Sequence, residues 1–380
     1  MAPGKVTLFF ILTALLFFVL IFELKIKDEM ADFEVNYKAG LRLSEGETPY
    51  RTTDGHWQFK YLPFSALLYL PLTYLPLSTA KACWFFLIVA ASVLIFVISS
   101  QIIDSKYDKA LLPAVIAVLV LGRYYFREIQ LGQINALLIC LLLVVVRLLA
   151  RPEGRAAAAG GACGGLAAAL KPYAVIVFPY FAIRKKWAAL AAGAAVLGLA
   201  VLSPALFFGW KGNLRVLGEW RSSLAASTPS LLSSQDNISL PGWLMKVTRD
   251  RDISLLLYAI IIIVLGALVL YLIHRGKFIS RAIALDGFLL LALIPLLSPL
   301  GWDYTFLSFT PAIMLISSHY RKYRPFWKIF LVLSFLVISL SLYDLMGRRL
   351  YAAFMSRSIL TLLFLSLIGY LAYLRIKGHA

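Results

Sequence analysis

The chain has 380 residues, of which 61% are hydrophobic and 15% are charged, and its mean hydropathy is +0.83. Soluble domains carry about 25% charged residues, and the alternating strands of an outer-membrane barrel are much less hydrophobic, so this composition excludes both classes. The formal net charge of +18 does not indicate nucleic-acid binding, because Lys and Arg lie in short clusters between apolar runs, the pattern that orients membrane spans. The sequence predicts an all-α polytopic membrane protein.

The first apolar run, Val6–Leu24, follows a basic start and has no small-residue cleavage site after it. We interpret it as an uncleaved first transmembrane helix whose N-terminus lies inside. It therefore delivers the next hydrophilic stretch to the outer face of the membrane. This first outer loop, residues 25–80, holds seven of the 19 acidic residues of the chain.

Three prolines divide residues 63–78 into pieces that are too short to span a membrane, because proline interrupts helical hydrogen bonding. We expect helical turns at the outer interface here, inside the first outer loop. Aromatic side chains favour such an interface. The expected interfacial aromatics are Trp57, Tyr61, Tyr69 and Tyr74.

Residues 156–183 are flanked by a basic cluster at each end, "ARPEGR" before and "RKKW" after. A single span would leave one cluster outside, against the positive-inside pattern. We therefore favour a hairpin of two half-depth helices that turns at Lys171-Pro172, although one span is the alternative. Pro172 breaks a helix, and the Gly and Ala residues before it allow close helix packing. The hairpin puts Lys171 at the floor of an outward-facing cavity.

The other apolar runs alternate plainly across the membrane. With the hairpin they give about twelve transmembrane helices in a single domain, residues 1–380, with a second outer loop at 210–252. The expected spans are 81–102, 110–124, 129–147, 188–208, 253–273, 282–299, 304–318, 325–343 and 353–374.

Asp32 is the candidate catalytic base. It follows the first helix by one to two turns, which puts it at membrane level beside the helix bundle, where a carboxylate can take a proton from a sugar hydroxyl. For any one acid of this loop taken alone, a solvated surface role is favoured. The basic and amide residues expected on the same face strengthen the catalytic interpretation.

Three basic residues are candidates for the donor phosphate: Lys171, Arg123 and Arg127. Arg binds phosphate through a bidentate fork and Lys as a point charge. Ionisable residues at membrane depth are usually functional, so phosphate binding is preferred to a snorkelling role for Lys171. Gln133 and Asn135, at the start of a helix, suit sugar hydroxyls, and helix capping or interhelical bonding is an equally supported role.

The remaining motifs predict no cofactor. The four histidines are scattered, so no metal constellation is visible, and no metal is expected. The "DRD" motif at Asp250–Asp252 matches the metal-binding motif of sugar-nucleotide transferases, but Asp252 is better explained as a helix cap. Neither a P-loop nor a "GxGxxG" fingerprint is present. Asp286, early in a span, is expected to start the helix or pair with a basic residue.

In order along the chain, these motifs resemble the polytopic polyprenyl-phosphate-sugar-dependent glycosyltransferases of family 87. This family includes mannosyltransferases that use polyprenol-phosphate mannose. The resemblance spans almost the whole chain and rests on "DFEVNYKAG", "TPY", "FKYLPFSALLYLPLTYLP", "LGQINALLICLLL", "GGLAAALKPYAVIVFPYFAIRKKW", "QDNISLPGWL" and "LLSPLGWDYTF". Single pieces are weakly specific, whereas the ordered set is strong. The resemblance implies a GT-C fold with an aspartate base in the first outer loop, here Asp32.

The resemblance also implies the substrates. A sugar, most often mannose, would pass from a polyprenyl-phosphate donor to a lipid-linked or cell-envelope glycan acceptor, with inversion and without a metal. The protein would lie in the cell (inner) membrane among membrane lipids, with its active site on the periplasmic or extracytoplasmic side and no nucleic-acid partner. The substrate-binding candidates are Tyr37, Tyr50, Gln133, Asn135, Asn237, Trp302, Asp303 and Tyr304.

One segment departs from the family pattern. The segment like "SPLGWDYTF" usually carries a histidine shortly after the tryptophan, and this chain has Asp303-Tyr304 there. If that histidine helps to bind the donor phosphate or the acceptor, Tyr304 or an arginine must substitute for it here.

Two other function classes compete with the enzyme. A transporter or lipid flippase would distribute intramembrane charges toward both faces and would be gated on both sides. Here the polar candidates gather on one face, next to a large outer loop. A nonenzymatic membrane scaffold would have no need of a buried Lys-Pro break. The sequence therefore favours the glycosyltransferase.

Overall fold

The computed structural model describes residues 12–13, 15–55, 57–103, 107–275 and 282–377, and the regular elements of these residues are all helical. The main helices are α2 Ala31–Ser44, α3 Pro63–Tyr69, α4 Leu77–Ile103, α5 Tyr107–Leu131, α6 Asn135–Leu149, α7 Gly154–Leu170, α8 Val177–Ile183, α9 Trp187–Leu202, α10 Ala205–Leu232, α11 Leu240–Thr248, α12 Arg251–Arg275, α13 Ala282–Leu297, α14 Thr310–Ser318, α15 Pro325–Leu340, α16 Tyr343–Ser356 and α17 Ile359–Lys377. Short 3-10 or π segments are η1 Phe22–Ile26, η2 Thr52–Asp54, η3 Leu70–Tyr74, η4 Pro172–Ile176, η5 Asp303–Phe309 and η6 Tyr320–Lys322.

Among the described residues, α4, α12 and α17 are long and apolar enough to cross a membrane. Three bent helix pairs raise this number to as many as six, namely residues 111–149 (119°), 187–232 (88°) and 325–356 (103°). The all-α, multi-pass prediction is confirmed, but the twelve expected spans are not shown. A crossing needs about 20 residues, and α13 and α14 have 16 and 9. The expected first span begins outside the described residues.

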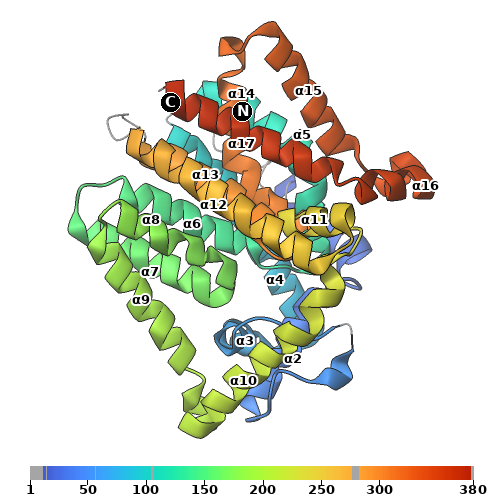
Figure 1. Cartoon of the computed structure of the whole chain (residues 1–380). Helices are drawn as coiled ribbons and strands as arrows, with labels where there is room; N and C mark the ends of the chain where they lie inside the picture. The colour runs from blue at the N-terminus through green and yellow to red at the C-terminus, as the bar shows by residue number, and fades with distance from the viewer. Residues whose placement is uncertain (1–11, 14, 56, 104–106, 276–281, 378–380) are drawn as a thin grey trace.

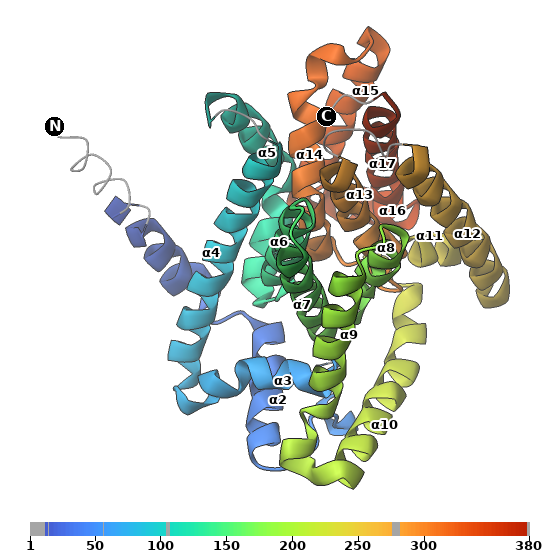
Figure 2. The ribbon, with the colours of Figure 1, turned by 90° about the vertical axis from the view of Figure 1, so that its left-hand side faces the viewer.

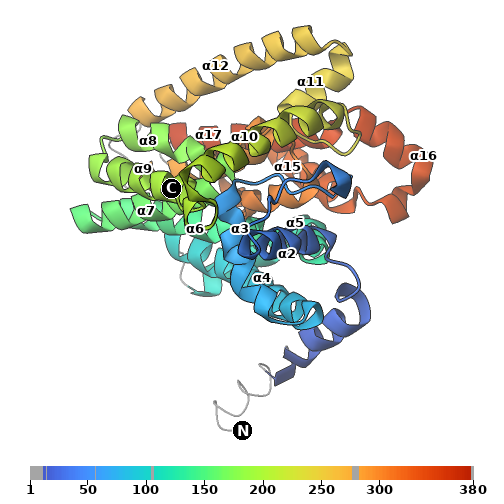
Figure 3. The same cartoon turned by 90° about the horizontal axis from the view of Figure 1, so that it is seen from below.

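The molecule has two distinct ends. Figures 1 and 2 place α2, α3 and α10 at the lower end, and the start of α15 and the end of α17 at the upper end. Figure 3, seen from below, shows α2 and α3 across this lower end, with α12 and α16 at the margins. Between the two ends, α13 is buried along almost its whole length.

The predicted break at Lys171 is confirmed. α7 ends at Leu170, Lys171 is extended with a φ of −138°, and η4 and α8 follow. α8 turns back and packs against α7. The two helices lie so close that a Cβ added to Gly164 of α7 would be 3.1 Å from the ring of Phe181 of α8. The small residues of α7 also allow the expected close packing, since a Cβ on Gly161 would meet a carbonyl oxygen of α9 at 2.0 Å.

The first outer loop folds back onto the bundle rather than extending into solvent. Met30 adopts a left-handed conformation, with a φ of 63°, just before α2. Its N–H donates to the carbonyl oxygen of Gln130 at 2.8 Å, which fastens the start of α2 to the end of α5. α2 then crosses α3 at close range. A Cβ added to Gly40 of α2 would lie 3.2 Å from the carbonyl oxygen of Ala66 of α3.

The expectations for the loops are met only in part. The prolines at 63–78 do give short helical turns, α3 and η3. Trp57 and Tyr74 are exposed, as expected for interfacial aromatics, whereas Tyr69 is buried 4.6 Å from the ring of Trp84. The second outer loop, expected at 210–252, is mostly helical and forms part of α10 and all of α11.

A buried charged cluster ties α8, α13 and α17 together. Asp286, only 2% exposed, accepts hydrogen bonds from Arg375 Nε at 2.9 Å and from Arg184 Nε at 3.1 Å. Arg184 also forms an ion pair with it, and the Tyr180 hydroxyl donates to it at 3.1 Å. The expected pairing of Asp286 is confirmed, and we call these four residues the Asp286 cluster.

Candidate active site

The residues that carry the predicted chemistry meet at the turn of the α7–α8 hairpin. Asp32 lies in the first turn of α2, Gln133 in the turn between α5 and α6, and Lys171 at the break after α7. The α5–α6 turn approaches α2 closely because Gly132 has a φ of +68°, and a Cβ there would meet a side-chain atom of α2 at 2.6 Å. Glycine is therefore required where the turn delivers Gln133 to Asp32.

Gln133 joins Asp32 to Lys171. Its Nε2 donates to Asp32 Oδ2 at 2.6 Å, and its Oε1 accepts from Lys171 Nζ at 3.0 Å. The Tyr61 hydroxyl donates to the same Oε1 at 3.3 Å. These contacts fix the orientation of the amide, because only its NH₂ group can donate to a carboxylate and only its oxygen can accept from an ammonium. A carboxylate and an ammonium thus lie at the two ends of one amide.

Lys171 is buried, 4% exposed, without an ion-pair partner in the part of the chain that the structure describes. Its Nζ donates to Asn135 Oδ1 at 2.9 Å. The centroids of Tyr61, Tyr173 and Tyr304 lie 5.0, 5.8 and 5.9 Å from it. Aromatic faces attract a cation, but they do not neutralise it. The nearest carboxylates, Asp32 and Glu128, attract the ammonium electrostatically from the far side of the Gln133 and Asn135 amides, without a direct ion pair.

Sequence reasoning missed Glu128, which organises this group from α5. It is fully buried, and its carboxylate accepts from Asn135 Nδ2 at 2.7 Å and from the N–H of Ala136 at 2.9 Å. The Asn135 amide is thereby turned so that its Oδ1 receives Lys171 and the Tyr173 hydroxyl. An acid close to Arg127 and to the "LGQIN" motif, in a chain with few acids, was the available signal. We call Asp32, Glu128, Gln133, Asn135 and Lys171 the Lys171 cluster.

Two neighbours of Asp32 in the first outer loop were also missed as site residues. Burial lowers the pKa of Lys60 below its usual value, and the negative charge of Asp32 opposes that shift. Burial raises the pKa of Tyr61, and the charge of Asp32 raises it further. Tyr61, expected at the membrane interface, contacts the Lys171 cluster through Gln133 and Lys171. Of the two, Tyr61 also reaches the site through its hydrogen bond to Gln133.

The two predicted arginines lie apart from Lys171. Arg123 donates to the carbonyl oxygen of Ser341 and packs over the Tyr124 ring at 4.4 Å. Its Nε and Nη2 are buried without a hydrogen-bond partner among the described residues, and Asp303 interacts with it electrostatically. Arg127 is exposed and donates to Gln130. The structure therefore joins Lys171 to Asp32 through Gln133, whereas Arg123 contacts Ser341 and Tyr124.

Comparison with known proteins assigns the chain to a family. The model of glycosyltransferase family 87 matches residues 59–299, more than half of the chain. The chain belongs to glycosyltransferase family 87. No curated protein and no solved structure matches it. The matched region contains all of the Lys171 cluster except Asp32, which precedes it.

In this membrane glycosyltransferase, Asn237 has a bracing role. It is fully buried, and its Oδ1 accepts from the N–H groups of Ser239 at 3.1 Å and Gly301 at 3.0 Å. Its Nδ2 donates to the carbonyl oxygen of Pro299 at 3.1 Å. These bonds fasten the loop between α10 and α11 to the segment just before Trp302. Asn237 thus positions the segment that carries the substrate-binding candidates at 302–304.

The other candidates divide between the site and its support. The Tyr304 ring lies beside Lys171, while the Asp303 carboxylate accepts from the N–H of Tyr304 at 2.8 Å. The Trp302 carbonyl accepts from Thr305. The hydroxyls of Tyr37 and Tyr50 donate to the carbonyl oxygens of Leu75 at 2.9 Å and Tyr61 at 2.5 Å, so both tie the first outer loop together.

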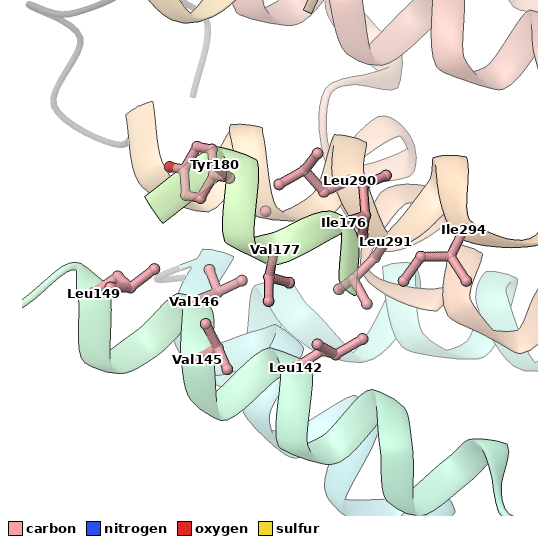
Figure 4. Close-up of a pocket in the computed structure, with 11 residues that line it drawn as sticks. Leu142, Val145, Val146, Leu149, Ile176, Val177, Tyr180, Leu290, Leu291 and Ile294 are labelled. Atoms are coloured by element: carbon pink, nitrogen blue, oxygen red, sulfur yellow. The ribbon is translucent and has the colours of Figure 1, made fainter. Parts of the chain in front are cut away.

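An apolar cavity in this glycosyltransferase lies away from the polar residues. Figure 4 shows side chains of α6, α8 and α13 around it, among them Val146, Val177 and Leu291. Its volume is about 20 Å³, close to what one water molecule needs. A sugar does not fit this cavity, so it is not a candidate sugar site. Within the described residues, no group of three or more His, Cys, Asp or Glu is arranged to hold a metal.

Proposed function

We propose that this glycosyltransferase moves a sugar, with mannose as the first candidate, from a polyprenyl-phosphate donor to a lipid-linked or cell-envelope glycan acceptor. The observation that carries the proposal is the bridge from Asp32 through Gln133 to Lys171. It puts a proton acceptor and a cation at the two ends of one amide. Glycosyl transfer from a phosphate-linked sugar needs both of these groups. The family assignment favours this enzyme over a transporter.

In the proposed reaction, Asp32 takes the proton of the acceptor hydroxyl while the hydroxyl oxygen attacks the anomeric carbon. The bond between that carbon and the phosphate oxygen breaks, and its electron pair stays on the oxygen. A polyprenyl phosphate with about two negative charges leaves. One displacement on the face opposite the leaving group inverts the anomeric configuration. No metal is required in this scheme because protein cations balance the new charge.

Lys171 is proposed to balance the charge that develops on the leaving phosphate. It is buried and has no ion-pair partner among the described residues, so it is preorganised for an anion and needs little rearrangement during the reaction. Glu128 acts through Asn135 and is a positioning residue. Gln133 and Asn135 hold the reacting groups, and the rings of Tyr61 and Tyr304 give the sugar an aromatic wall.

The missing family histidine is proposed to be replaced by two residues. The Tyr304 ring lies beside Lys171, and Arg123 keeps two buried N–H donors that have no partner among the described residues. The leaving polyprenyl phosphate carries one phosphate group, not a diphosphate, so a few hydrogen-bond donors are enough to bind it. An arginine fork supplies two. Arg127 is proposed only to attract the anionic donor from solvent.

The proposed orientation in the cell (inner) membrane puts the Lys171 cluster on the extracytoplasmic side. The basic residues Arg324 and Lys377 lie where α15 begins and α17 ends. Figures 1 and 2 place that end opposite α2 and α3. The positive-inside pattern then assigns α2 to the outer face. A membrane-impermeant thiol reagent added outside should label a cysteine at Lys38 and should not label one at Lys186.

The test is an assay on purified protein in lipid nanodiscs. Labelled polyprenyl-phosphate mannose, the matching glucose donor and mannose as a sugar nucleotide are each supplied with a membrane lipid extract. Mass spectrometry identifies the glycosylated product. We expect transfer only from the polyprenyl-phosphate donor and only with the extract. Transfer from the sugar nucleotide in the absence of any polyprenyl phosphate would refute the proposal.

A further inference from the structure

A groove runs between α15 and α17, at the end of the molecule opposite the Lys171 cluster. Its volume is about 620 Å³, within the range of about 300–1,000 Å³ typical of ligand sites. Trp327 and Phe330 line it from α15, and Gly369, Tyr370 and Tyr373 from α17. The family match ends at residue 299, so neither helix lies in the matched region.

The aromatic wall of the groove is held in place. The Tyr370 hydroxyl donates to the carbonyl oxygen of Trp327 at 2.7 Å, and the rings of Tyr323 and Tyr370 meet edge to face at 5.2 Å. Trp327 and Tyr373 nevertheless remain 49% and 41% exposed. The wall thus offers rigid apolar surface, which costs little side-chain entropy when a ligand covers it.

The length of the groove matches one leaflet of a membrane. Its lining on α17 extends from Lys377 to Ser366, and eleven residues of helix span about 16 Å. The hydrocarbon core of a bilayer is about 30 Å thick. Because α17 is long and apolar enough to cross a membrane, the groove reaches about half-way into the core from its basic end. A single lipid tail has this reach.

The charge of the groove lies at one end. Arg324 and Lys377, both exposed, line it where α15 begins and α17 ends. Neither α15 nor α17 contains an acidic residue that would neutralise them. The remainder of the groove is aromatic or small. An occupant must therefore carry an anionic group at one end and a long apolar chain behind it.

We propose that this groove binds one anionic phospholipid from the leaflet at the basic end. Its headgroup phosphate lies between Arg324 and Lys377, and one acyl chain follows the aromatic wall. The polyprenyl-phosphate donor is not the proposed occupant, because the groove lies at the far end of the molecule from the Lys171 cluster. The inference therefore does not rest on the proposed function.

The experiment measures lipid retention by native mass spectrometry of the full-length protein. The probes are phosphatidylglycerol, phosphatidylcholine and a polyprenyl phosphate, each titrated into delipidated protein. We expect one phosphatidylglycerol to bind in preference to phosphatidylcholine. The double variant Arg324→Gln/Lys377→Gln removes the two charges proposed to contact the headgroup. Its affinity for phosphatidylglycerol should be about 30-fold weaker. The double variant Arg321→Gln/Lys322→Gln removes the same charge outside the groove lining and should retain the lipid.

A second variant tests the apolar part of the groove. Gly369 lines the groove, and a Cβ there would meet nothing within 4 Å, so Gly369→Phe adds a ring at the groove wall and phosphatidylglycerol binding should fall at least tenfold. Gly266 on α12 is equally open, and Gly266→Phe is the matched control. Unchanged binding in Gly369→Phe, equal retention of phosphatidylcholine, or preferential retention of polyprenyl phosphate would each overturn the proposal.

Discussion

The Lys171 cluster and the Asp286 cluster both bury charge in this glycosyltransferase, and they do so in opposite ways. Asp286 accepts from two arginines and a tyrosine, so its charge is matched within the protein. Lys171 is held by neutral amide oxygens and aromatic rings, and no carboxylate forms an ion pair with it among the described residues.

The contrast teaches how to distinguish a structural charge from a functional one. A buried carboxylate that forms direct ion pairs ties elements together, here α8, α13 and α17. A buried cation whose direct contacts are neutral amide oxygens, with its nearest carboxylates one amide away, can still form a direct ion pair with a ligand anion. The two clusters should therefore respond differently to mutation: the Lys171 cluster through catalysis, and the Asp286 cluster through stability.

The largest effect is expected from Asp32→Asn, which keeps the shape and the hydrogen bond to Gln133 but removes the basic oxygen. General-base catalysis contributes about 10²–10⁴-fold, so the turnover rate should fall by that factor while donor binding persists. Glu29→Gln, an exposed acid three residues earlier, is the control and should retain activity. Near-normal turnover of correctly inserted Asp32→Asn would remove Asp32 as the base.

Asp286→Ala should have the next largest effect, on stability. It leaves the buried Arg375 and the partly buried Arg184 without their shared carboxylate, and breaking a buried ion pair costs about 3–5 kcal/mol. Thermal unfolding in detergent measures the loss, and the activity per folded molecule should stay close to that of the wild type. A loss of turnover with unchanged stability would break the comparison, because the Asp286 cluster would then be functional.

Lys171→Met should reduce kcat/KM about 10²–10³-fold, the typical cost of losing one preorganised charge stabiliser. Met keeps most of the chain volume and removes the buried charge, so the thermal stability should be equal to or higher than that of the wild type. Kinetics at subsaturating donor, paired with thermal unfolding, tests both parts. A stability loss as large as that of Asp286→Ala would mean that Lys171 is structural.

The smallest effect concerns the Arg42–Asp54 ion pair of the first outer loop, whose closest atoms are 2.6 Å apart. Hydrogen bonds from Arg42 hold the pKa of Asp54 below its usual value. The pair therefore stabilises the folded protein fully at pH values above about 3.9, the pKa of an aspartate in the unfolded chain. This contribution is lost as the pH falls through the lower, folded pKa. Asp54→Asn should cost about 1 kcal/mol or less at pH 7.

Thermal unfolding of wild type and Asp54→Asn from pH 7 to pH 3 checks this prediction. The difference between them should shrink towards the acid end. A difference that grows on acidification would reverse the sign of the linkage. The result also gives the comparison a reference point, because it measures an ion pair outside the apolar core.

The sequence by itself determined the helical membrane class, the break at Lys171 and the helical turns after Pro63. These features depend on local chemistry: apolar run length, proline and small residues act within a few turns of their own position. It also picked out Asp32, Gln133, Asn135 and Lys171 as candidates. That they form one connected group was outside its reach, because the contacts join residues 36 to 101 positions apart.

Only the tertiary structure decided which polar residues meet and which buried charges are matched. Glu128 gains its role from the turn at Gly132 that brings Asn135 back to it, and Arg123 contacts Ser341 and Tyr124 rather than the Lys171 cluster. Span number also depended on bends of 88° to 119° between helices, which hydropathy does not encode. Burial and pairing are properties of neighbours in space, so a single chain position cannot specify them.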